Sequence, residues 1–160
     1  MTDEKGSAAA SEERSHPKRI PLAQRRKARR VILQALYQWL ITSDAPSGIA
    51  KQYQEDTPGK VDWEYFTEVF LEIPKCVEEL DEHLNPRLDR KPEALDPIEK
   101  SLLYLGCYEL AFRIDVPYRV VINECVELAK VFGATDGHKY INGVLDKLAK
   151  ELRAIEFNAK

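Results

Sequence analysis

The sequence predicts an all-α fold of six to seven helices arranged in two packed helical subbundles. Apolar residues recur at helical spacing along most of the chain, and no alternating strand pattern of useful length interrupts them. Proline, glycine and N-cap signals divide the periodic segments into separate helices. With 160 residues, of which 44% are hydrophobic, the chain is long enough for one domain with a real core.

We expect this helical domain to cover residues 19–157. Residues 1–18 are rich in Ala, Ser, Glu and Lys, so we expect a disordered N-terminal extension there. The extension lacks the apolar run of a signal peptide, and no segment approaches the 18 uninterrupted apolar residues of a membrane span. These features predict a cytoplasmic protein with no membrane partner.

The first helix is predicted over residues 22–42. Its apolar side chains follow the i, i+3, i+4, i+7 spacing of a stripe that faces a core. The members of this stripe are Ala28, Val31, Ile32, Ala35, Leu36, Trp39 and Leu40. Pro21 suits the first turn, because the N–H that it lacks would have no partner there.

The next two helices are predicted over residues 47–55 and 62–84. Pro58 and Gly59 separate them. Pro74 should kink the longer helix, because proline removes one backbone donor. A polar linker over residues 85–96 then connects the two expected subbundles.

The fourth helix is predicted over residues 97–113. The string Asp96-Pro97-Ile98-Glu99 combines an N-cap carboxylate, a first-turn proline and an N3 glutamate, which is a strong local signal for a helix start. The following residues are apolar almost all round. We therefore expect this helix to be the central, buried one.

The last two helices are predicted over residues 117–132, ending at Gly133, and over residues 137–157. Asn123 and Asn142 are poor helix formers inside them, which favours a buried hydrogen-bonding role. Gly143 costs up to about 1 kcal/mol relative to Ala in a helix, so close helix packing is expected there.

Charge is distributed unevenly along the chain. Residues 14–30 carry eight Lys or Arg and no Asp or Glu, whereas residues 31–160 carry 15 basic and 23 acidic side chains. A field concentrated on one element attracts phosphate, and counterion release makes such binding favourable and salt-sensitive. RNA or DNA is therefore the first partner to consider. The alternative is a solvated, disordered basic tail.

Five of these eight basic residues lie on the first predicted helix, which argues for a docked cationic surface. Arg25 with Arg29, and Arg26 with Arg30, are like-charge pairs at i, i+4, which cost a few tenths of a kcal/mol each. Phosphates that neutralise these side chains would offset that cost.

Motifs for catalysis are missing from the sequence. The three histidines have no metal-ligand spacing, and neither a Gly-rich phosphate loop nor a nucleophile elbow is present. The three cysteines are Cys76, Cys107 and Cys125; they lie in apolar helical patterns and are typical of reduced core residues. The sequence favours a binding protein over an enzyme, with no metal or cofactor.

Five blocks of sequence carry a family resemblance. They are Arg25-Arg26-Lys27-Ala28-Arg29 followed by Gln34-Ala35-Leu36-Tyr37; Tyr108-Glu109-Leu110; Asp115-Val116-Pro117-Tyr118; Val121-Ile122-Asn123-Glu124 followed by Glu127-Leu128-Ala129-Lys130; and His138-Lys139-Tyr140-Ile141-Asn142-Gly143-Val144-Leu145-Asp146. In order and spacing these blocks resemble the NusB family of bacterial transcription antitermination factors. The resemblance covers about residues 25–153.

The resemblance implies a function and partners. It implies a helical protein that pairs with ribosomal protein NusE. The pair would bind the boxA element of nascent RNA and help RNA polymerase to resist termination, notably on ribosomal RNA operons. The implied partners are boxA-type single-stranded RNA, NusE and the RNA polymerase antitermination complex. A homodimer of the free protein stays open.

The resemblance also implies candidate RNA-binding residues. The family's arginine-rich segment matches Arg25, Arg26, Lys27 and Arg29, and Arg30 extends it at a position that is often acidic in the family. We expect these side chains to hold phosphates.

A second RNA-contacting region of the family matches Asp136, Lys139 and Tyr140. Tyr140 stands where the family usually has Phe, and its ring would stack on a base. Asp136 would read base edges or restrain affinity by repulsion. Without the resemblance, Tyr140 reads equally well as an edge-of-core aromatic, and Asp136 as a residue that favours the helix dipole.

Two further residues match positions at or near the NusE interface of the family, Tyr37 and Glu99. Tyr37 also fits an edge-of-core position, and Glu99 is first of all a capping residue. Two other functions stay open: a helical RNA-binding domain related to that of ribosomal RNA cytosine methyltransferases, and a helical interaction module without an RNA partner.

Overall fold

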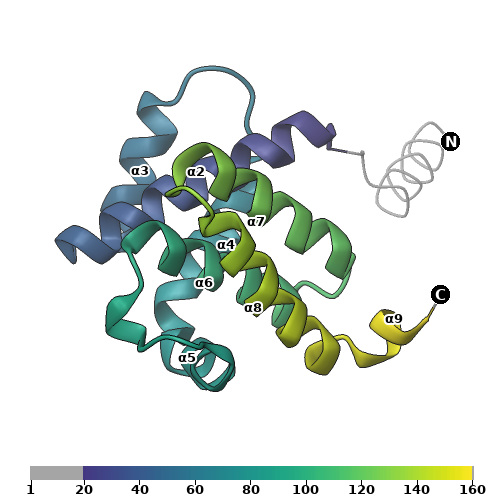
Figure 1. Cartoon of the computed structure of the whole chain (residues 1–160). Coiled ribbons are helices and arrows are strands. Elements are labelled where there is room, and N and C mark those ends of the chain that lie inside the picture. The colour runs from purple at the N-terminus through teal and green to yellow at the C-terminus, as the bar shows by residue number, and fades with distance from the viewer. Residues whose placement is uncertain (1–19, 160) are drawn as a thin grey trace, which may run out of the picture.

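The computed structural model describes residues 20–159, and every regular element within them is a helix (Figure 1). Seven α-helices have eight residues or more, and a single-turn helix follows them. They are α2 (Leu22–Thr42), α3 (Pro46–Asp56), α4 (Trp63–Glu72), α5 (Val77–Leu84), α6 (Pro97–Phe112), α7 (Tyr118–Phe132) and α8 (Gly137–Leu152), followed by α9 (Ala154–Asn158). The all-α prediction is confirmed. The extension predicted for residues 1–18 lies outside the described residues.

The helices form two groups that meet along α2 and α6. Helices α2, α3 and α4 pack against one another, and α6, α7 and α8 form the second group. Helix α2 also packs on α6, and the chain passes through α5 and residues 85–96 between the groups (Figure 1). This is the arrangement in two subbundles that the sequence predicts.

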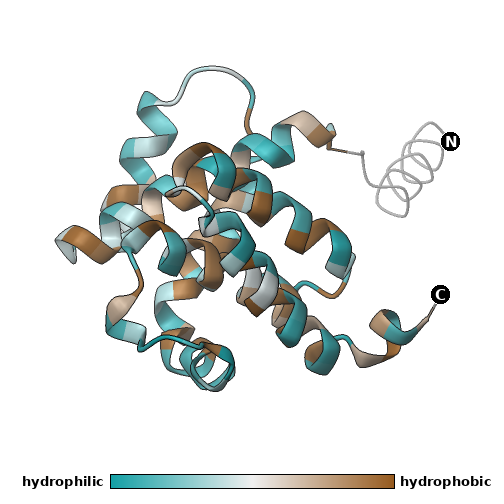
Figure 2. Cartoon of the chain, in the orientation of Figure 1, coloured by the Kyte–Doolittle hydropathy of each residue, from teal (hydrophilic) through white to brown (hydrophobic). Residues whose placement is uncertain are grey.

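Most of the predicted stripe of α2 enters the core; its last two residues, Trp39 and Leu40, are only partly buried, and Leu33, outside the stripe, is buried as well. Ala28, Ile32, Ala35 and Leu36 are fully buried, and Val31 is 2% exposed. Figure 2 shows apolar and polar residues mixed along the helices, as expected for helices that bury one face. The basic residues of α2 are therefore carried on a helix that is fixed in the fold.

Helix α6 is the central helix, as predicted. Every residue from Ser101 to Leu110 is buried. Its start is a complete capping box, in which the Asp96 carboxylate accepts from the Glu99 N–H at 2.8 Å and the Glu99 carboxylate accepts from the Asp96 N–H at 3.4 Å.

The helix predicted over residues 62–84 is two helices rather than one kinked helix. A 3₁₀ turn, Ile73–Cys76, separates α4 from α5. Pro74 explains the break. Its ring would clash with the backbone carbonyl four residues earlier in a continuous helix, and it has no N–H to donate. The sequence located the break correctly and underestimated its extent.

The last helix also ends earlier than the predicted residue 157. Helix α8 stops at Leu152, and Arg153 leaves helical geometry with φ −125°. Its buried guanidinium donates to three backbone carbonyls at the end of α6, those of Glu109, Leu110 and Arg113, at 2.8 to 3.1 Å. The Arg113 N–H also donates to the Glu109 carbonyl, and the Val116 N–H to the Arg113 carbonyl, so Arg153 adds side-chain donors to the C-terminal end of α6.

Three expectations about residues inside α7 and α8 are wrong. Gly143 is exposed, and a Cβ there would have nothing within 4 Å, so no close helix packing explains it. Asn123 and Asn142 are exposed rather than buried. Close packing occurs instead at Gly106 of α6, where a Cβ would lie 2.7 Å from a Leu145 methyl group.

All three cysteines are free thiols; Cys107 and Cys125 are buried and Cys76 is half-buried. Burial raises the pKa of the Cys107 thiol to about 12. None of the helices in residues 20–159 is long and apolar enough to cross a membrane. The same residues contain no cluster of His, Cys, Asp or Glu suited to a metal ion.

Candidate nucleic-acid interface

Helix α2 divides its five basic residues by their position around the helix axis. Arg26 and Arg30 are exposed, Arg25 and Lys27 are half-buried, and Arg29 is buried. Residues four apart share a face of a helix, so Arg26 and Arg30 form one edge. That edge faces α7.

Arg29 points into the core and has a structural role. Its side chain is 2% exposed and makes a two-pronged ion pair with Glu109 of α6, whose side chain is fully buried; the closest distance, Nη2 to Oε2, is 2.9 Å. Tyr65 of α4 donates its hydroxyl to the same carboxylate. Burial alone would lower the pKa of Arg29, but Glu109 raises it above its ordinary value. The phosphate-binding role expected for Arg29 is therefore wrong, because its guanidinium is buried and the Glu109 carboxylate already neutralises its charge.

Arg25 and Lys27 are held by the segment that precedes α4. Arg25 pairs with the Asp62 carboxylate at 2.8 Å, and its guanidinium lies 3.8 Å from the centre of the Tyr65 ring. The Lys27 ammonium donates to the Pro58 carbonyl. The Arg25 side chain keeps 25% of its surface exposed. Both cations are thus anchored at the surface rather than free.

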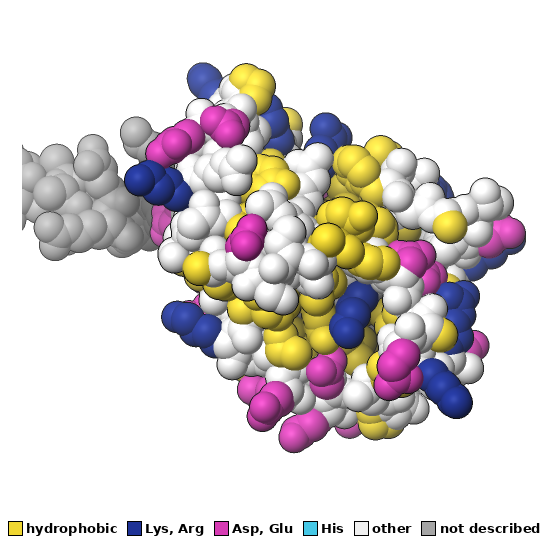
Figure 3. All heavy atoms as spheres, turned by 90° about the vertical axis from the view of Figure 1, so that its left-hand side faces the viewer, with side chains coloured by type: hydrophobic (Ala, Val, Ile, Leu, Met, Phe, Trp, Pro, Cys, Tyr) yellow, Lys and Arg dark blue, Asp and Glu magenta, His cyan; other side chains and the backbone are white. Residues whose placement is uncertain are grey.

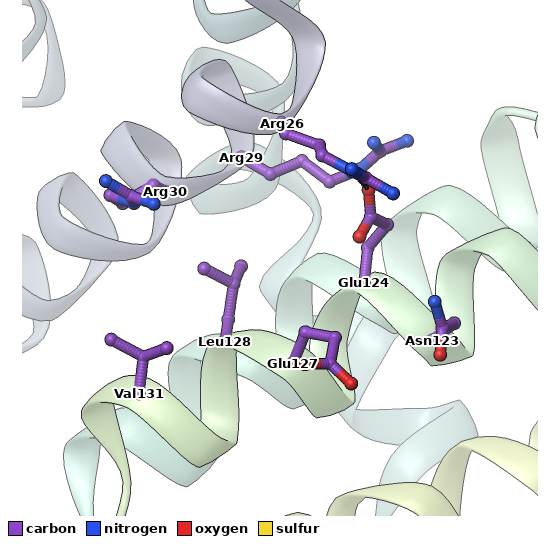
Figure 4. Close-up of a pocket in the computed structure, with 8 residues that line it drawn as sticks. All are labelled: Arg26, Arg29, Arg30, Asn123, Glu124, Glu127, Leu128 and Val131. Carbon is purple, nitrogen blue, oxygen red and sulfur yellow. Dashed lines mark hydrogen bonds and ion pairs between the residues drawn. The ribbon is translucent and has the colours of Figure 1, made fainter. Parts of the chain in front are cut away.

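Arg26 and Arg30 are the most accessible cations of the set. Arg26 is 58% exposed and pairs with Glu124 of α7, with 2.7 Å between Nε and Oε1. Within residues 20–159, Arg30 makes no ion pair. Figure 4 shows Arg26 reaching toward Glu124, while Arg30 lies apart from this pair; both arginines line one groove with Leu128 and Val131. The edge of α2 is therefore cationic, and two glutamates of α7, Glu124 and Glu127, line the groove beside it.

The second predicted RNA-contacting region lies at the start of α8. Asp136 precedes the helix in the left-handed conformation, with φ 67°, and pairs with Lys139 at 3.3 Å on the surface. Tyr140 is half-buried, and the Arg90 guanidinium lies 4.0 Å from its ring centre. One face of this ring is thus already covered by a cation. Burial, followed by nearby Asp89, raises the pKa of Tyr140.

The two residues predicted to contact a protein partner differ in exposure. Tyr37 is 40% exposed on the C-terminal half of α2. Glu99 is 6% exposed and accepts from Arg90 as well as closing the capping box. A partner would have to displace Arg90 to reach the Glu99 carboxylate.

Sequence reasoning missed the acidic partners of the basic tract. Asp62, Glu109 and Glu124 are remote in sequence from α2, and each meets one arginine of it. Glu109 gave one usable signal, a charged residue within an otherwise apolar helix. Such a residue is seldom fully buried without a partner.

Comparisons with known proteins agree on one family. Residues 26–150 match the NusB family. The transcription antitermination protein NusB of Alcanivorax borkumensis is 56% identical over 133 residues, covering 82% of this chain and 89% of the relative. The protein of the same name from Pasteurella multocida is 48% identical and covers 88% of this chain and 96% of the relative.

Solved structures give the same result for the fold. A crystal structure of the antitermination factors NusB and NusE in complex with double-stranded RNA aligns with a TM-score of 0.74 and 26% identity, covering 81% of this chain and 98% of the neighbour. The structure of T. maritima NusB aligns with a TM-score of 0.72 and 28% identity, covering 84% of this chain and 94% of the neighbour.

Proposed function

The chain belongs to the NusB family of transcription antitermination proteins, and on this premise we propose that it pairs with ribosomal protein NusE and binds boxA-type RNA. The RNA would be the nascent transcript, notably of ribosomal RNA operons, and binding would keep RNA polymerase processive. Membership also assigns a non-enzymatic role. The site of action that we propose is the cytoplasm, where bacterial transcripts are made.

The exposed edge of α2 is the observation that carries the RNA part of the proposal. Arg26 and Arg30 lie on a helix whose opposite face is fully buried, so their positions are fixed before RNA arrives. A fixed pair of guanidinium groups binds phosphate at a smaller entropic cost than a flexible tail. Arg25 and Lys27, on the adjacent face, extend the cationic surface.

In this proposal phosphates replace the acidic partners of the surface cations. Arg26 would exchange Glu124 for a phosphate, and Arg25 would share its charge between Asp62 and the strand. Exposed ion pairs contribute about 0 to 1 kcal/mol, so this exchange is cheap. Lys139, Asp136 and Tyr140 stay the predicted second contact, and the planar Arg90 guanidinium, which lies over the Tyr140 ring, would offer a flat surface to a base.

An apolar groove supports the protein-partner part of the proposal. It lies beside the C-terminal half of α2 and has a volume of about 560 Å³. Its apolar lining comes from α2, α3, α6 and the end of α7, and the residues are Leu33, Tyr37, Ile41, Tyr53, Ile98 and Phe132. Figure 3 views the side of the molecule where α3 and the C-terminal end of α2 lie, and hydrophobic side chains gather on it. Exposed apolar surface of this kind is typical of a protein interface.

We propose NusE as the occupant of this groove. Tyr37 lines it directly, and so does Ile98, the residue before Glu99. Tyr37 therefore serves as a direct contact, whereas Glu99 would act after Arg90 moves. The groove and the cationic edge lie on the same helix, so one α2 would serve both partners.

The test is fluorescence anisotropy of a labelled boxA-type RNA, titrated with the full chain alone and with the chain plus purified NusE. We expect binding by the chain alone and tighter binding with NusE. Size-exclusion chromatography of the mixture would give the stoichiometry, and the free protein run alone would test the homodimer. Binding of NusE without any binding of RNA would favour the interaction module instead.

A methyltransferase-related domain is disfavoured by the comparisons. The relatives reported above are named antitermination protein NusB, and the chain covers 89% and 96% of their own lengths. A methyl-transfer assay on ribosomal RNA with this chain should give no product.

A further inference from the structure

A groove between α2 and α7 has the features of a binding site for one nucleobase. It has a volume of about 400 Å³ and is lined from α2 by Arg26, Arg29 and Arg30. Helix α7 contributes Asn123 and Glu124, with Leu128 forming an apolar wall (Figure 4). Its cationic rim is the edge of α2 to which the proposed function assigns phosphates.

Arg29, one of the residues that line this groove, has a buried hydrogen-bond donor without an acceptor. Arg29 donates hydrogen bonds from Nε and Nη2 to the Glu109 carboxylate, and its third nitrogen, Nη1, does not contact this carboxylate. Within residues 20–159, Nη1 is buried without a hydrogen-bond partner. An unsatisfied buried donor costs about 1 to 3 kcal/mol, so proteins seldom keep one without a reason. An acceptor from a ligand in the groove would satisfy it.

The mixed charge of the groove argues against a phosphate as its occupant. Glu124 and Glu127 line it together with the arginines, and a phosphate placed inside would meet both carboxylates. A neutral base with donors on one edge and acceptors beside them suits such a lining. The phosphates of the same strand would remain at the exposed rim, on Arg26 and Arg30.

From this geometry we propose that the groove takes a guanine base of the single-stranded RNA, an inference that rests on the proposed function. Guanine carries N1–H and N2–H side by side, which match the two oxygens of the Glu124 carboxylate. Its O6 is adjacent to N1–H and would accept from the orphaned Arg29 Nη1. Leu128 provides an apolar surface for the ring.

Other bases fit this pattern less well. Uracil has a single ring donor between two carbonyl acceptors, so one of those oxygens would face the carboxylate. Adenine presents no second donor next to its amino group. Inosine is the sharpest comparison, because it keeps O6 and N1–H of guanosine and lacks only the N2 amino group.

The proposal is tested with the full chain and short RNAs by fluorescence anisotropy. The RNAs are an oligouridine and its counterparts with one guanosine or one inosine placed in turn at each position. A bidentate base contact discriminates by about 5- to 150-fold, so we expect the best guanosine RNA to bind at least about 5-fold tighter than the oligouridine. Its inosine counterpart should fall between them.

The variant Glu124→Gln separates the base site from general RNA binding. It removes the carboxylate and also frees Arg26 from its ion pair. We expect the preference for guanosine to fall by at least about 5-fold, while affinity for the oligouridine stays the same or rises. Glu78→Gln, which removes one carboxylate from exposed α5, is the control and should keep the wild-type preference.

Each outcome decides between the two proposals. Equal binding of all RNAs by the wild type, or an unchanged preference in Glu124→Gln, overturns the guanine site and leaves the RNA-binding function standing. A complete lack of RNA binding, with or without NusE, overturns both.

Discussion

At the scale of single residues, burial decides which arginines of α2 are structural and which are functional. Arg29 and Arg30 are neighbours with the same charge, yet one is enclosed against Glu109 and the other is exposed. Removing one partner of a buried ion pair leaves an uncompensated charge in a low dielectric, whereas water replaces the partner of an exposed one. Substitution of Arg29 should therefore lower the stability of the fold, whereas substitution of Arg30 should affect RNA binding.

Arg29→Ala should destabilise the fold. Loss of this partner leaves the Glu109 carboxylate buried and paired only with Tyr65, so we expect the free energy of unfolding to fall by about 3 to 5 kcal/mol. Urea denaturation followed by circular dichroism measures it. Arg30→Ala is the matched control and should stay within about 0.5 kcal/mol of the wild type. Equal stabilities of the two variants would contradict the structural role of Arg29.

Replacing Arg26 and Arg30 together by Ala should weaken the salt dependence of RNA binding. Each phosphate contact on single-stranded RNA contributes roughly 0.7 to the slope of log K against log salt, so the slope should flatten by about 1 to 1.5. Anisotropy titrations over a range of salt concentrations give this slope. Lys51→Ala with Lys147→Ala removes the same charge from exposed positions on α3 and α8 and should leave the slope unchanged. A flattening of equal size in both double variants would mean that net charge, not contact, governs binding.

At the scale of helices, the packing of α6 on α8 depends on a close approach that one glycine permits. A Cβ at Gly106 would lie 2.7 and 2.8 Å from the two methyl groups of Leu145, which is itself fully buried. The exposed Gly143 on α8 has no such constraint. Glycine thus permits close packing at position 106 in α6, whereas at position 143 it only lowers the helix propensity of α8.

Substituting these glycines by Ala should give opposite changes in stability. Gly106→Ala should lower the free energy of unfolding by about 1 to 2 kcal/mol, because overpacking in the core exceeds the gain in helix propensity. Gly143→Ala should raise it by up to about 1 kcal/mol, since only the propensity changes. Urea denaturation of the two variants checks both signs. Destabilisation by Gly143→Ala would contradict the open space that surrounds Gly143 in the structure.

At the scale of the whole molecule, the core encloses several tyrosine and cysteine side chains that ionise only at strongly alkaline pH. Burial raises the pKa of Tyr108 and of Cys107 to about 12. The pKa of Tyr65 is raised further, first by burial and then by the neighbouring Glu109 carboxylate, and burial raises the pKa of Tyr104 as well. Such groups couple the fold to alkaline pH.

The fold should lose stability as the pH rises above about 10. The folded-state pKa of these tyrosines lies above the unfolded value of about 10, so their contribution is complete below that pH and declines above it. Absorbance at a phenolate wavelength near pH 11 should therefore show fewer ionised tyrosines in the folded protein than in urea. Tyr65→Phe should reduce the loss of stability at alkaline pH. Urea denaturation at neutral pH and near pH 11 measures this loss in the variant and the wild type. Full ionisation of the native tyrosines below pH 11 would contradict this enclosure.

The sequence by itself determined the all-α class, most helix starts, and the family. Helical spacing, the Asp96 capping signal and the blocks from Arg25 onward are local, so short-range reasoning reached them. Only the tertiary structure decided that Arg29 is structural, that Gly106 rather than Gly143 is the close-packed glycine, and that Glu124 lies against Arg26. The physical reason is distance along the chain. A side chain's burial and charge partner are set by elements that fold back from dozens of residues away, and a periodicity within one helix contains no information about them.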